Sequence, residues 1–131
     1  MSRIIIASGP VIVENGNVLV NKHGDTAFWK FCGGRVENLN EGLIDVSRRE
    51  AKEEMGIELK ILDQQPFLFF TTKHTDLEGA LDMILVHYLA ERIGDVHPGE
   101  DIREWKWLNI QYLPDDLGPN IIPALKYFGL Y

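Results

Sequence analysis

The pattern that most constrains the fold is one strong helical period set between runs of strand-like residues. In residues 42 to 55, apolar side chains recur three and four positions apart, and this spacing predicts an amphipathic helix. Gly56 would end the helix as its left-handed cap. The side chains predicted to face a core are Leu43, Ile44, Ala51 and Met55.

A β-hairpin is predicted at the start of the chain. Strand-like runs from Ile4 to Val13 and from Asn17 to Asn21 flank Asn15-Gly16, the dipeptide that most readily adopts the positive φ angles of a tight turn. Further strands are predicted at Phe28 to Cys32, Ile57 to Ile61, Phe67 to Phe70, Ala80 to Ala90 and Trp105 to Leu108.

The closing element is predicted to be a helix from Asn120 to Phe128, with Asn120 as its N-cap. The run from Ala80 to Ala90 is nearly all apolar, which predicts a central strand. Strands, helix, strands and helix follow one another in a chain of 131 residues. We therefore expect residues 1–131 to form one α/β domain, in which helices cover the faces of a mixed sheet.

The charge and the cysteine content exclude several classes of protein. The chain has 20 acidic and 13 basic residues, and its net charge of −7 would repel long DNA or RNA. No stretch approaches the ~20 apolar residues that cross a bilayer. Cys32 is the only cysteine, and the four histidines have no partner at zinc-ligand spacing. We expect a cytoplasmic protein that binds no membrane and whose metal, if present, has oxygen ligands.

The acidic residues concentrate in two stretches. Residues 41 to 58 hold six acids and three bases, and residues 91 to 104 hold five acids and two bases, so the two stretches supply −6 of the net −7. Either stretch alone is typical of a solvated helix face or loop. Together they make a cation site a hypothesis worth pursuing.

Three carboxylates share one face of the predicted helix. Glu50, Glu53 and Glu54 stand at positions i, i+3 and i+4, which places them within about 5–6 Å of one another. They would repel each other unless a cation lay between them, and Mg²⁺ suits this role because it prefers oxygen ligands. The alternative is a solvated acidic face paired with the neighbouring bases Arg48, Arg49 and Lys52.

The surrounding stretch resembles the Nudix box. That motif is a glycine, a short loop, a glutamate, seven residues, Arg-Glu, an apolar residue, any residue, Glu-Glu, any residue, a glycine and an apolar residue. A chance match at so many specified positions is far rarer than a chance match to a lone glycine motif. The resemblance covers most of the chain and implies the Nudix α/β/α sandwich. The chain reads Gly33-Gly34-Arg35-Val36-Glu37-Asn38-Leu39-Asn40-Glu41, then seven residues, then Arg49-Glu50-Ala51-Lys52-Glu53-Glu54-Met55-Gly56-Ile57.

The chain departs from the Nudix pattern at two places. Six residues separate Gly34 from Glu41, whereas the family usually has five. We place the extra residue in the turn at residues 38 to 40, because loops tolerate insertions best. Cys32 stands where the family commonly has proline; a catalytic thiol is one interpretation, and a small buried apolar side chain is the favoured one.

The resemblance implies roles for the acidic residues. Glu50, Glu53 and Glu54 would hold Mg²⁺, which Mn²⁺ can replace, aided by the Gly33 main-chain carbonyl. Arg49 would pair with the glutamate at position 41 and brace the glycine loop against the helix.

The family also takes a catalytic acid from a later loop, as a metal ligand or as the base that deprotonates water. The candidates are Glu100, Asp101 and Glu104. We favour Glu100, because Glu104 lies at the start of a strand and Asp101 is suited to a turn or cap.

Three residues are candidates for substrate binding. Lys22 occupies a place where the family often has a base that reaches a phosphate, and Arg35 lies beside the glycine loop. Ordinary solvated charge explains both positions equally well. Asn120 resembles the position at which Nudix hydrolases of oxidised guanine nucleotides contact the base, and helix N-capping explains it about as well.

The resemblance therefore predicts a Mg²⁺-dependent hydrolase that splits a phosphoanhydride bond in a nucleoside diphosphate linked to another moiety. Its partner would be a small nucleotide, and the protein would be a monomer or a homodimer. The alternatives are a catalytically silent Nudix-fold sensor that binds a nucleotide, and a structural domain that binds divalent ions. The intact Arg-Glu and Glu-Glu pairs favour the enzyme.

Overall fold

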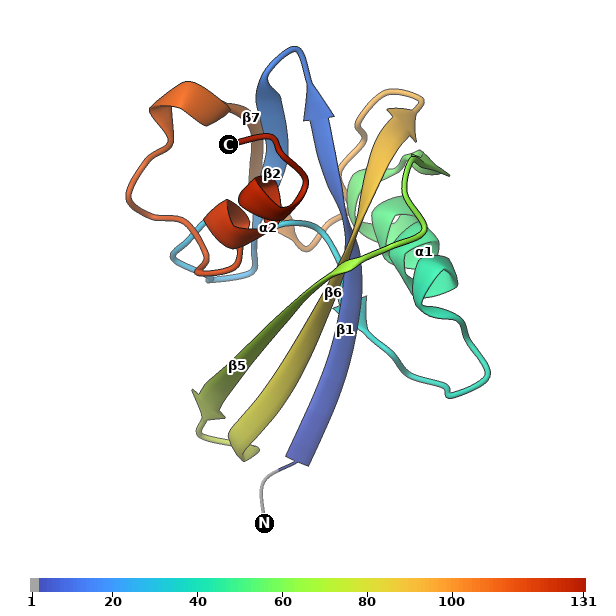
Figure 1. The fold of residues 1–131 in the computed structure, drawn as a ribbon. Coiled ribbons are helices and arrows are strands. Elements are labelled where there is room, and N and C mark those ends of the chain that lie inside the picture. The colour runs from blue at the N-terminus through green and yellow to red at the C-terminus, as the bar shows by residue number, and fades with distance from the viewer. Residues whose placement is uncertain (1–2) are drawn as a thin grey trace.

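The computed structural model describes residues 3–131 and has the mixed α/β architecture that the sequence predicts (Figure 1). None of the helices in these residues is long and apolar enough to cross a membrane. The strands are β1 (Arg3–Glu14), β2 (Asn17–His23), β3 (Gly34–Arg35), β4 (Glu58–Ile61), β5 (Phe67–Thr75), β6 (Gly79–Ile93) and β7 (Ile102–Asn109). The helices are α1 (Leu43–Met55), α2 (Ile121–Tyr127) and a short 3₁₀ helix (Ile110–Tyr112).

Asn15 and Gly16 form the predicted turn between β1 and β2. Their φ angles are 51° and 77°, the two positive values that a type I′ hairpin turn requires. The turn pairs Val13 with Val18 in the antiparallel ladder. On its other edge β2 pairs antiparallel with β7, which the sequence predicted only as a short strand. The hairpin prediction is confirmed.

β6 is an interior strand with partners on both edges, in agreement with its apolar sequence, although β1 lies in the middle of the strand order. It pairs in parallel with β1 from Arg3 and Leu81 to Ile12 and Ala90. On its other edge β6 pairs antiparallel with β5 and, further along, with β4. One parallel and several antiparallel pairings make the sheet mixed.

The strands lie between two hydrophobic cores, because successive residues of a strand point to opposite faces. Val11 of β1 belongs to a cluster that includes Leu125 of α2, whereas the next residue, Ile12, belongs to a cluster that includes Met55 of α1. Figure 1 shows α1 and α2 on opposite sides of the strands. This is the predicted sandwich.

The buried face of α1 differs in part from the prediction. Leu43 and Ile44, predicted to face the core, are only half-buried. Val46 is fully buried, and the Ser47 hydroxyl shares a 2.7 Å hydrogen bond with the Ser8 hydroxyl of β1. A buried serine contributes nothing to a hydrophobic period, which explains why the pattern misplaced this face.

The strand predicted from Phe28 to Cys32 is wrong. Only isolated bridges occur there, between Lys30 and Asn21 and between Trp29 and Leu117. Consecutive residues of this segment bond to two different parts of the chain, so no continuous ladder forms. The segment crosses the core on the α2 side, where Trp29 and Phe31 are buried, and this burial accounts for its apolar character.

Candidate active site

The three predicted carboxylates on α1 differ in burial: Glu50 is buried, Glu54 is partly buried and Glu53 is exposed. The Glu50 and Glu54 side chains are 11% and 12% exposed, whereas that of Glu53 is 59% exposed. All three lie on the helix face that the i, i+3, i+4 spacing predicts. Burial of two neighbouring carboxylates is costly unless other groups compensate their charge.

The second acidic stretch reaches these carboxylates through the end of α1. Gly56 adopts φ +69° and ends the helix, which leaves the last carbonyl groups without helical partners. The Glu54 carbonyl accepts a 2.9 Å hydrogen bond from the Gly99 amide, and the Met55 carbonyl accepts a 2.8 Å bond from the His97 amide. The loop that carries residues 95 to 101 is thereby fixed against the carboxylate face.

A small cavity of about 140 Å³ lies between this loop and the helix. Glu100 and Asp101 line it, whereas Glu104 is absent from its walls. Glu104 instead lies 3.9 Å from the Lys22 ammonium and 3.6 Å from the Arg103 guanidinium. The lining residues are His23, Glu50, Glu53, Glu54, Gly99, Glu100, Asp101 and Ile102.

The glycine segment is in direct contact with the carboxylates. The Gly33 amide donates a 2.8 Å hydrogen bond to Glu54 Oε1. A Cβ atom on Gly34 would occupy the position of the Glu50 carboxylate, and a Cβ atom on Gly9 of β1 would collide with the Cys32 carbonyl. Glycine is required here because helix, loop and strand approach too closely for any side chain.

Arg49 forms the predicted pair with Glu41. Its Nε and Nη2 donate to the two carboxylate oxygens of Glu41 at 2.8 and 3.1 Å, and its Nη1 donates to Glu50 Oε1 at 2.7 Å. The guanidinium therefore ties the loop to a carboxylate of the helix. The extra loop residue causes no strain, because the turn before Glu41 is exposed and closed by a 2.8 Å hydrogen bond from the Asn40 amide to the Asn38 side chain.

The pKa values of the two glutamates on α1 and of Glu41 shift in opposite directions. Burial raises the pKa of Glu54 to about 7, although the hydrogen bond from Gly33 opposes the shift. Burial also raises the pKa of Glu50 against the effect of Arg49. The hydrogen bonds from Arg49 lower the pKa of the partly buried Glu41 carboxyl. The positive charge near Glu50 and Glu54 therefore does not offset the effect of burial.

The carboxylates fit a hard divalent cation. Their oxygens are the ligands that Mg²⁺ prefers, and the raised pKa values of Glu50 and Glu54 show carboxylates without enough compensating charge. No three His, Cys, Asp or Glu side chains among residues 3–131 already form a metal-binding group. Glu50 is bonded to Arg49 and Glu54 to Gly33, so a cation would compete with these two contacts.

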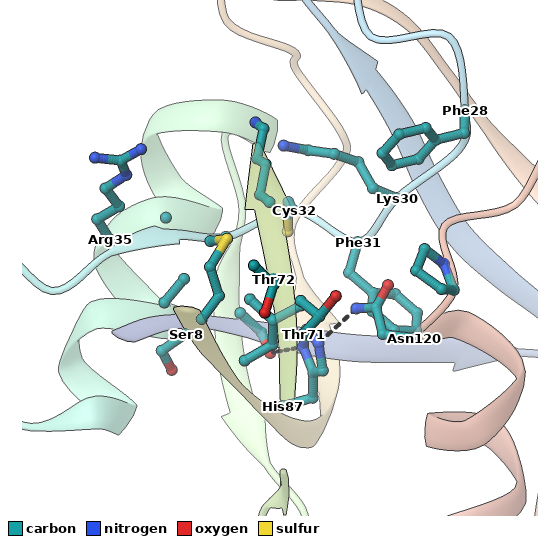
Figure 2. A pocket seen from close by; sticks show the side chains of 18 residues that line it. Ser8, Phe28, Lys30, Phe31, Cys32, Arg35, Thr71, Thr72, His87 and Asn120 are labelled. Carbon is teal, nitrogen blue, oxygen red and sulfur yellow. Dashed lines mark hydrogen bonds between the residues drawn. The ribbon is translucent and has the colours of Figure 1, made fainter. Parts of the chain in front are cut away.

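A second, larger cavity of about 480 Å³, drawn in Figure 2, has Gly33 and Gly34 in its wall, whereas neither glycine lines the small cavity. Of the three predicted substrate-binding residues, Arg35 and Asn120 line it and Lys22 does not. The residues around it are Ala7, Ser8, Gly9, Phe28, Lys30, Phe31, Cys32, Gly33, Gly34, Arg35, Thr71, Thr72, Lys73, Met83, Leu85, His87, Pro119 and Asn120.

Lys22 and Arg35 both have acidic partners. The Lys22 ammonium lies 3.3 Å from Asp116 and 4.5 Å from the centre of the Trp29 ring. The Arg35 guanidinium donates to both carboxylate oxygens of Glu78, at 3.2 and 3.1 Å. Their phosphate contacts stay predictions, and Lys22 is not among the residues that line either cavity.

Asn120 stands at the N-cap position of α2, but its side chain makes no capping hydrogen bond. Instead its Nδ2 atom lies 2.8 Å from Nε2 of His87 in β6. The N-cap explanation of this residue is therefore wrong for the side chain. Cys32 is buried, and burial raises the pKa of its thiol far above the ordinary value, as the apolar interpretation predicts.

Several residues around the two cavities had no role in the sequence prediction. His23 lies 4.0 Å from Glu54, and Lys30 and His87 line the larger cavity. His87 carries a signal, because it interrupts the apolar run of β6. Gly9 carries another, since an isolated glycine in a strand often marks a close backbone approach.

Comparison with solved structures shows that the fold is shared. A MutT Nudix hydrolase from Burkholderia pseudomallei is 24% identical, with a TM-score of 0.76 over 95% of this chain and 98% of that chain. A Nudix-family hydrolase from Clostridium perfringens is 19% identical, with a TM-score of 0.73 over 95% and 96%. A UDP-X diphosphatase is 16% identical, with a TM-score of 0.72 over 100% and 66%. No curated protein sequence matches the chain.

The family to which the chain belongs follows from its sequence as a whole. Residues 5–128 match the model of the NUDIX domain, a range that reaches from β1 to the end of α2 and includes both cavities. The chain belongs to the Nudix family, and it is a hydrolase that acts on phosphorus-containing acid anhydrides such as the pyrophosphate bond.

Proposed function

We propose that the protein is a Mg²⁺-dependent pyrophosphohydrolase of small nucleotides, which splits the phosphoanhydride bond of a nucleoside diphosphate that is linked to another moiety. The observation that supports this is the hydrogen bond from Gly33 to Glu54. Gly33 lines the larger cavity, which is large enough for a nucleoside, and Glu54 lies on the helix face that carries the carboxylates. The hydrogen bond therefore connects the two cavities. A nucleotide bound in the larger cavity would extend its phosphates across the glycine segment toward Glu54.

The carboxylates Glu50, Glu53 and Glu54 would hold Mg²⁺, and the Gly33 carbonyl is a further proposed ligand. When bound, the ion would supply positive charge that offsets the phosphates and favours ionisation of water. Mn²⁺ has the same preference for oxygen and would substitute.

The chain's own residues would position the reactants. Arg49 holds the Glu50 carboxylate through a 2.7 Å hydrogen bond. Glu100, at the wall of the small cavity, would accept the proton of the attacking water. The water oxygen would then bond to phosphorus as the bond to the leaving phosphate breaks. Lys30 and Arg35, which line the larger cavity, would attract the phosphates.

A substrate panel tests this proposal. Nucleoside triphosphates, nucleotide sugars and dinucleoside polyphosphates would be incubated with the protein and Mg²⁺, and release of phosphate or pyrophosphate would be measured. We expect turnover that excess chelator abolishes. Full turnover in chelator would contradict the metal assignment, and nucleotide binding without turnover would identify a sensor. The UDP-X diphosphatase among the similar structures makes UDP-linked compounds a necessary part of the panel. The expected cytoplasmic location stays a prediction.

A further inference from the structure

Two buried polar side chains form a chain of hydrogen bonds in the wall of the larger cavity (Figure 2). His87 and Asn120 are 6% and 7% exposed. Nδ1 of His87 lies 3.1 Å from the Gly9 carbonyl oxygen, and Nε2 of His87 lies 2.8 Å from Nδ2 of Asn120. Both nitrogens of the imidazole ring therefore have a hydrogen-bond partner.

The Gly9 carbonyl determines the direction of both hydrogen bonds. A carbonyl can only accept, so Nδ1 of His87 carries the proton and donates it. A neutral imidazole with a protonated Nδ1 has a bare Nε2, which accepts, so the Asn120 amino group is the donor. Burial lowers the pKa of His87 to about 4, and the ring is therefore neutral near pH 7.

The Asn120 amide is locked by this arrangement. Rotation of the amide by 180° would place its oxygen against the bare Nε2 of His87, and two acceptors would then face each other. Figure 2 shows the Asn120 oxygen directed away from His87, and Asn120 is one of the residues that line the cavity. No hydrogen bond from residues 3–131 reaches this oxygen. The cavity therefore presents a fixed, unpaired acceptor.

We propose that the cavity selects nucleotides whose base carries an amino group, and that His87 is the positioning residue that sets this preference by fixing the Asn120 oxygen toward the base. This inference rests on the proposed function, because it takes the ligand to be a nucleotide. An amino-bearing base, such as adenine, guanine or cytosine, satisfies the acceptor with an N–H donor. Uracil places its only N–H between two carbonyl oxygens, which the fixed acceptor repels.

The remaining walls agree with this orientation of the ligand. Phe31, Met83 and Leu85 are apolar and suit the faces of a base. The basic residues Lys30 and Arg35 lie on the opposite side of the cavity from His87 in Figure 2. A nucleotide with its base at Asn120 therefore directs its phosphates toward the basic residues and the glycine segment.

Equilibrium binding without metal tests the preference independently of catalysis. Dissociation constants of adenosine, guanosine, cytidine and uridine monophosphates would be measured by calorimetry. The tightest ligand would then be compared with an analogue whose base has no N–H donor: purine riboside monophosphate for a purine, because inosine keeps an N–H at N1, or 2-pyrimidinone riboside monophosphate for cytidine. We expect an amino-bearing base to bind most tightly, and removal of the amino group to weaken binding by roughly 10-fold or more, because a buried acceptor is then left unpaired.

A variant of His87 tests the lock. In His87→Leu the Asn120 amide is free to rotate, and the site can then offer the base either a donor or an acceptor. The dissociation constant of the analogue without the amino group, divided by that of the amino-bearing nucleotide, should therefore fall below about 3. The matched control is Met83→Leu, which changes the same cavity but leaves the lock intact and should keep the ratio. If His87→Leu fails to fold, the ¹⁵N shifts of the wild-type imidazole decide, since they must show a protonated Nδ1 and a bare Nε2.

The outcomes separate this inference from the proposed function. Tightest binding of uridine monophosphate, equal binding of the matched analogues, or a protonated Nε2 would each overturn the lock, whether or not nucleotides are hydrolysed. A failure to hydrolyse any nucleotide would overturn the proposed function, and the monophosphate ratios would still decide the base preference. Absence of binding by every monophosphate would overturn the inference.

Discussion

The two cavities differ in how their polar groups are satisfied. In the small cavity, buried carboxylates lie side by side, and burial raises the pKa of Glu50 and of Glu54. In the larger cavity, His87 has a partner at each ring nitrogen. The first arrangement is unfavourable until a cation binds, whereas the second is already stable. The difference indicates that the carboxylates of the small cavity serve catalysis, whereas the polar groups of the larger cavity serve ligand recognition.

The largest effect is expected from Glu54→Gln. Glutamine keeps the oxygen that accepts the Gly33 hydrogen bond but removes the charge that a cation requires. Turnover should therefore fall by at least ~10²-fold, comparable to the loss of a principal electrostatic stabiliser. The melting temperature without metal should stay unchanged or rise, because a repulsive buried charge is removed. Turnover and melting would be measured on the same sample.

A solvated acidic face predicts the reverse for Glu54→Gln, namely unchanged turnover and a small loss of stability. Near-wild-type hydrolysis would remove the metal role of Glu54. Glu58→Gln is the matched control, because Glu58 is an exposed glutamate whose partner is Lys52, and it should leave turnover unchanged.

The larger cavity predicts a pH effect on stability. In the unfolded chain His87 takes up a proton near its ordinary pKa of 6.5, but in the folded protein only near pH 4. The unfolded state therefore binds more protons between these values, and the free energy of unfolding falls as the pH falls through this window. The loss reaches at most about 3 kcal/mol. Urea denaturation at pH 7 and pH 4.5 would measure it.

His87→Gln isolates this contribution, since glutamine is polar but does not titrate. The difference in unfolding free energy between the two pH values should change by an amount approaching that limit. Because Glu50 and Glu54 have raised pKa values, they contribute with the opposite sign, so the comparison must be made between variant and wild type. The exposed His74 supplies the control variant His74→Gln. An identical pH dependence in His87→Gln and wild type would show that His87 titrates normally.

A smaller effect is expected from Arg49→Ala. This guanidinium contacts Glu41 and Glu50 but no core residue, so its loss should misplace a carboxylate without unfolding the protein. We expect turnover to fall by roughly 10- to 100-fold, the range for residues that orient a metal ligand. Lys52→Ala, which removes an exposed base of the same helix, should have little effect. Wild-type activity of Arg49→Ala would show that the motif has been misaligned.

The smallest effect distinguishes two lysines. Lys30 lines the larger cavity, whereas Lys22 is held by Asp116 and Trp29. Lys30→Ala should raise KM by about 5-fold, as expected for loss of one charge contact of roughly 1 kcal/mol with a phosphate. Lys22→Ala should raise KM less. Initial rates across substrate concentrations would compare them, and a larger KM effect at Lys22 would restore its predicted phosphate contact.

The sequence alone determined the features whose geometry depends only on residues close together in the chain. Asn15-Gly16 formed the predicted turn because both residues tolerate positive φ, and Gly56 ended α1 for the same reason. The common face of the three glutamates on α1 follows from helical geometry and needs no tertiary contact. The Glu41 and Arg49 pair was also predictable, but only through resemblance to the Nudix box.

Tertiary structure decided everything that depends on residues distant in sequence. The parallel pairing of β1 with β6 places Gly9 beside His87, and the loop before α2 places Asn120 within hydrogen-bonding distance of that ring. Neither contact has a local signature, because pairing register and loop placement are set by which faces become buried together. The segment from Phe28 to Cys32 failed as a strand for the same reason: its apolar composition reflects burial in the core, and no neighbouring strand was available along its length.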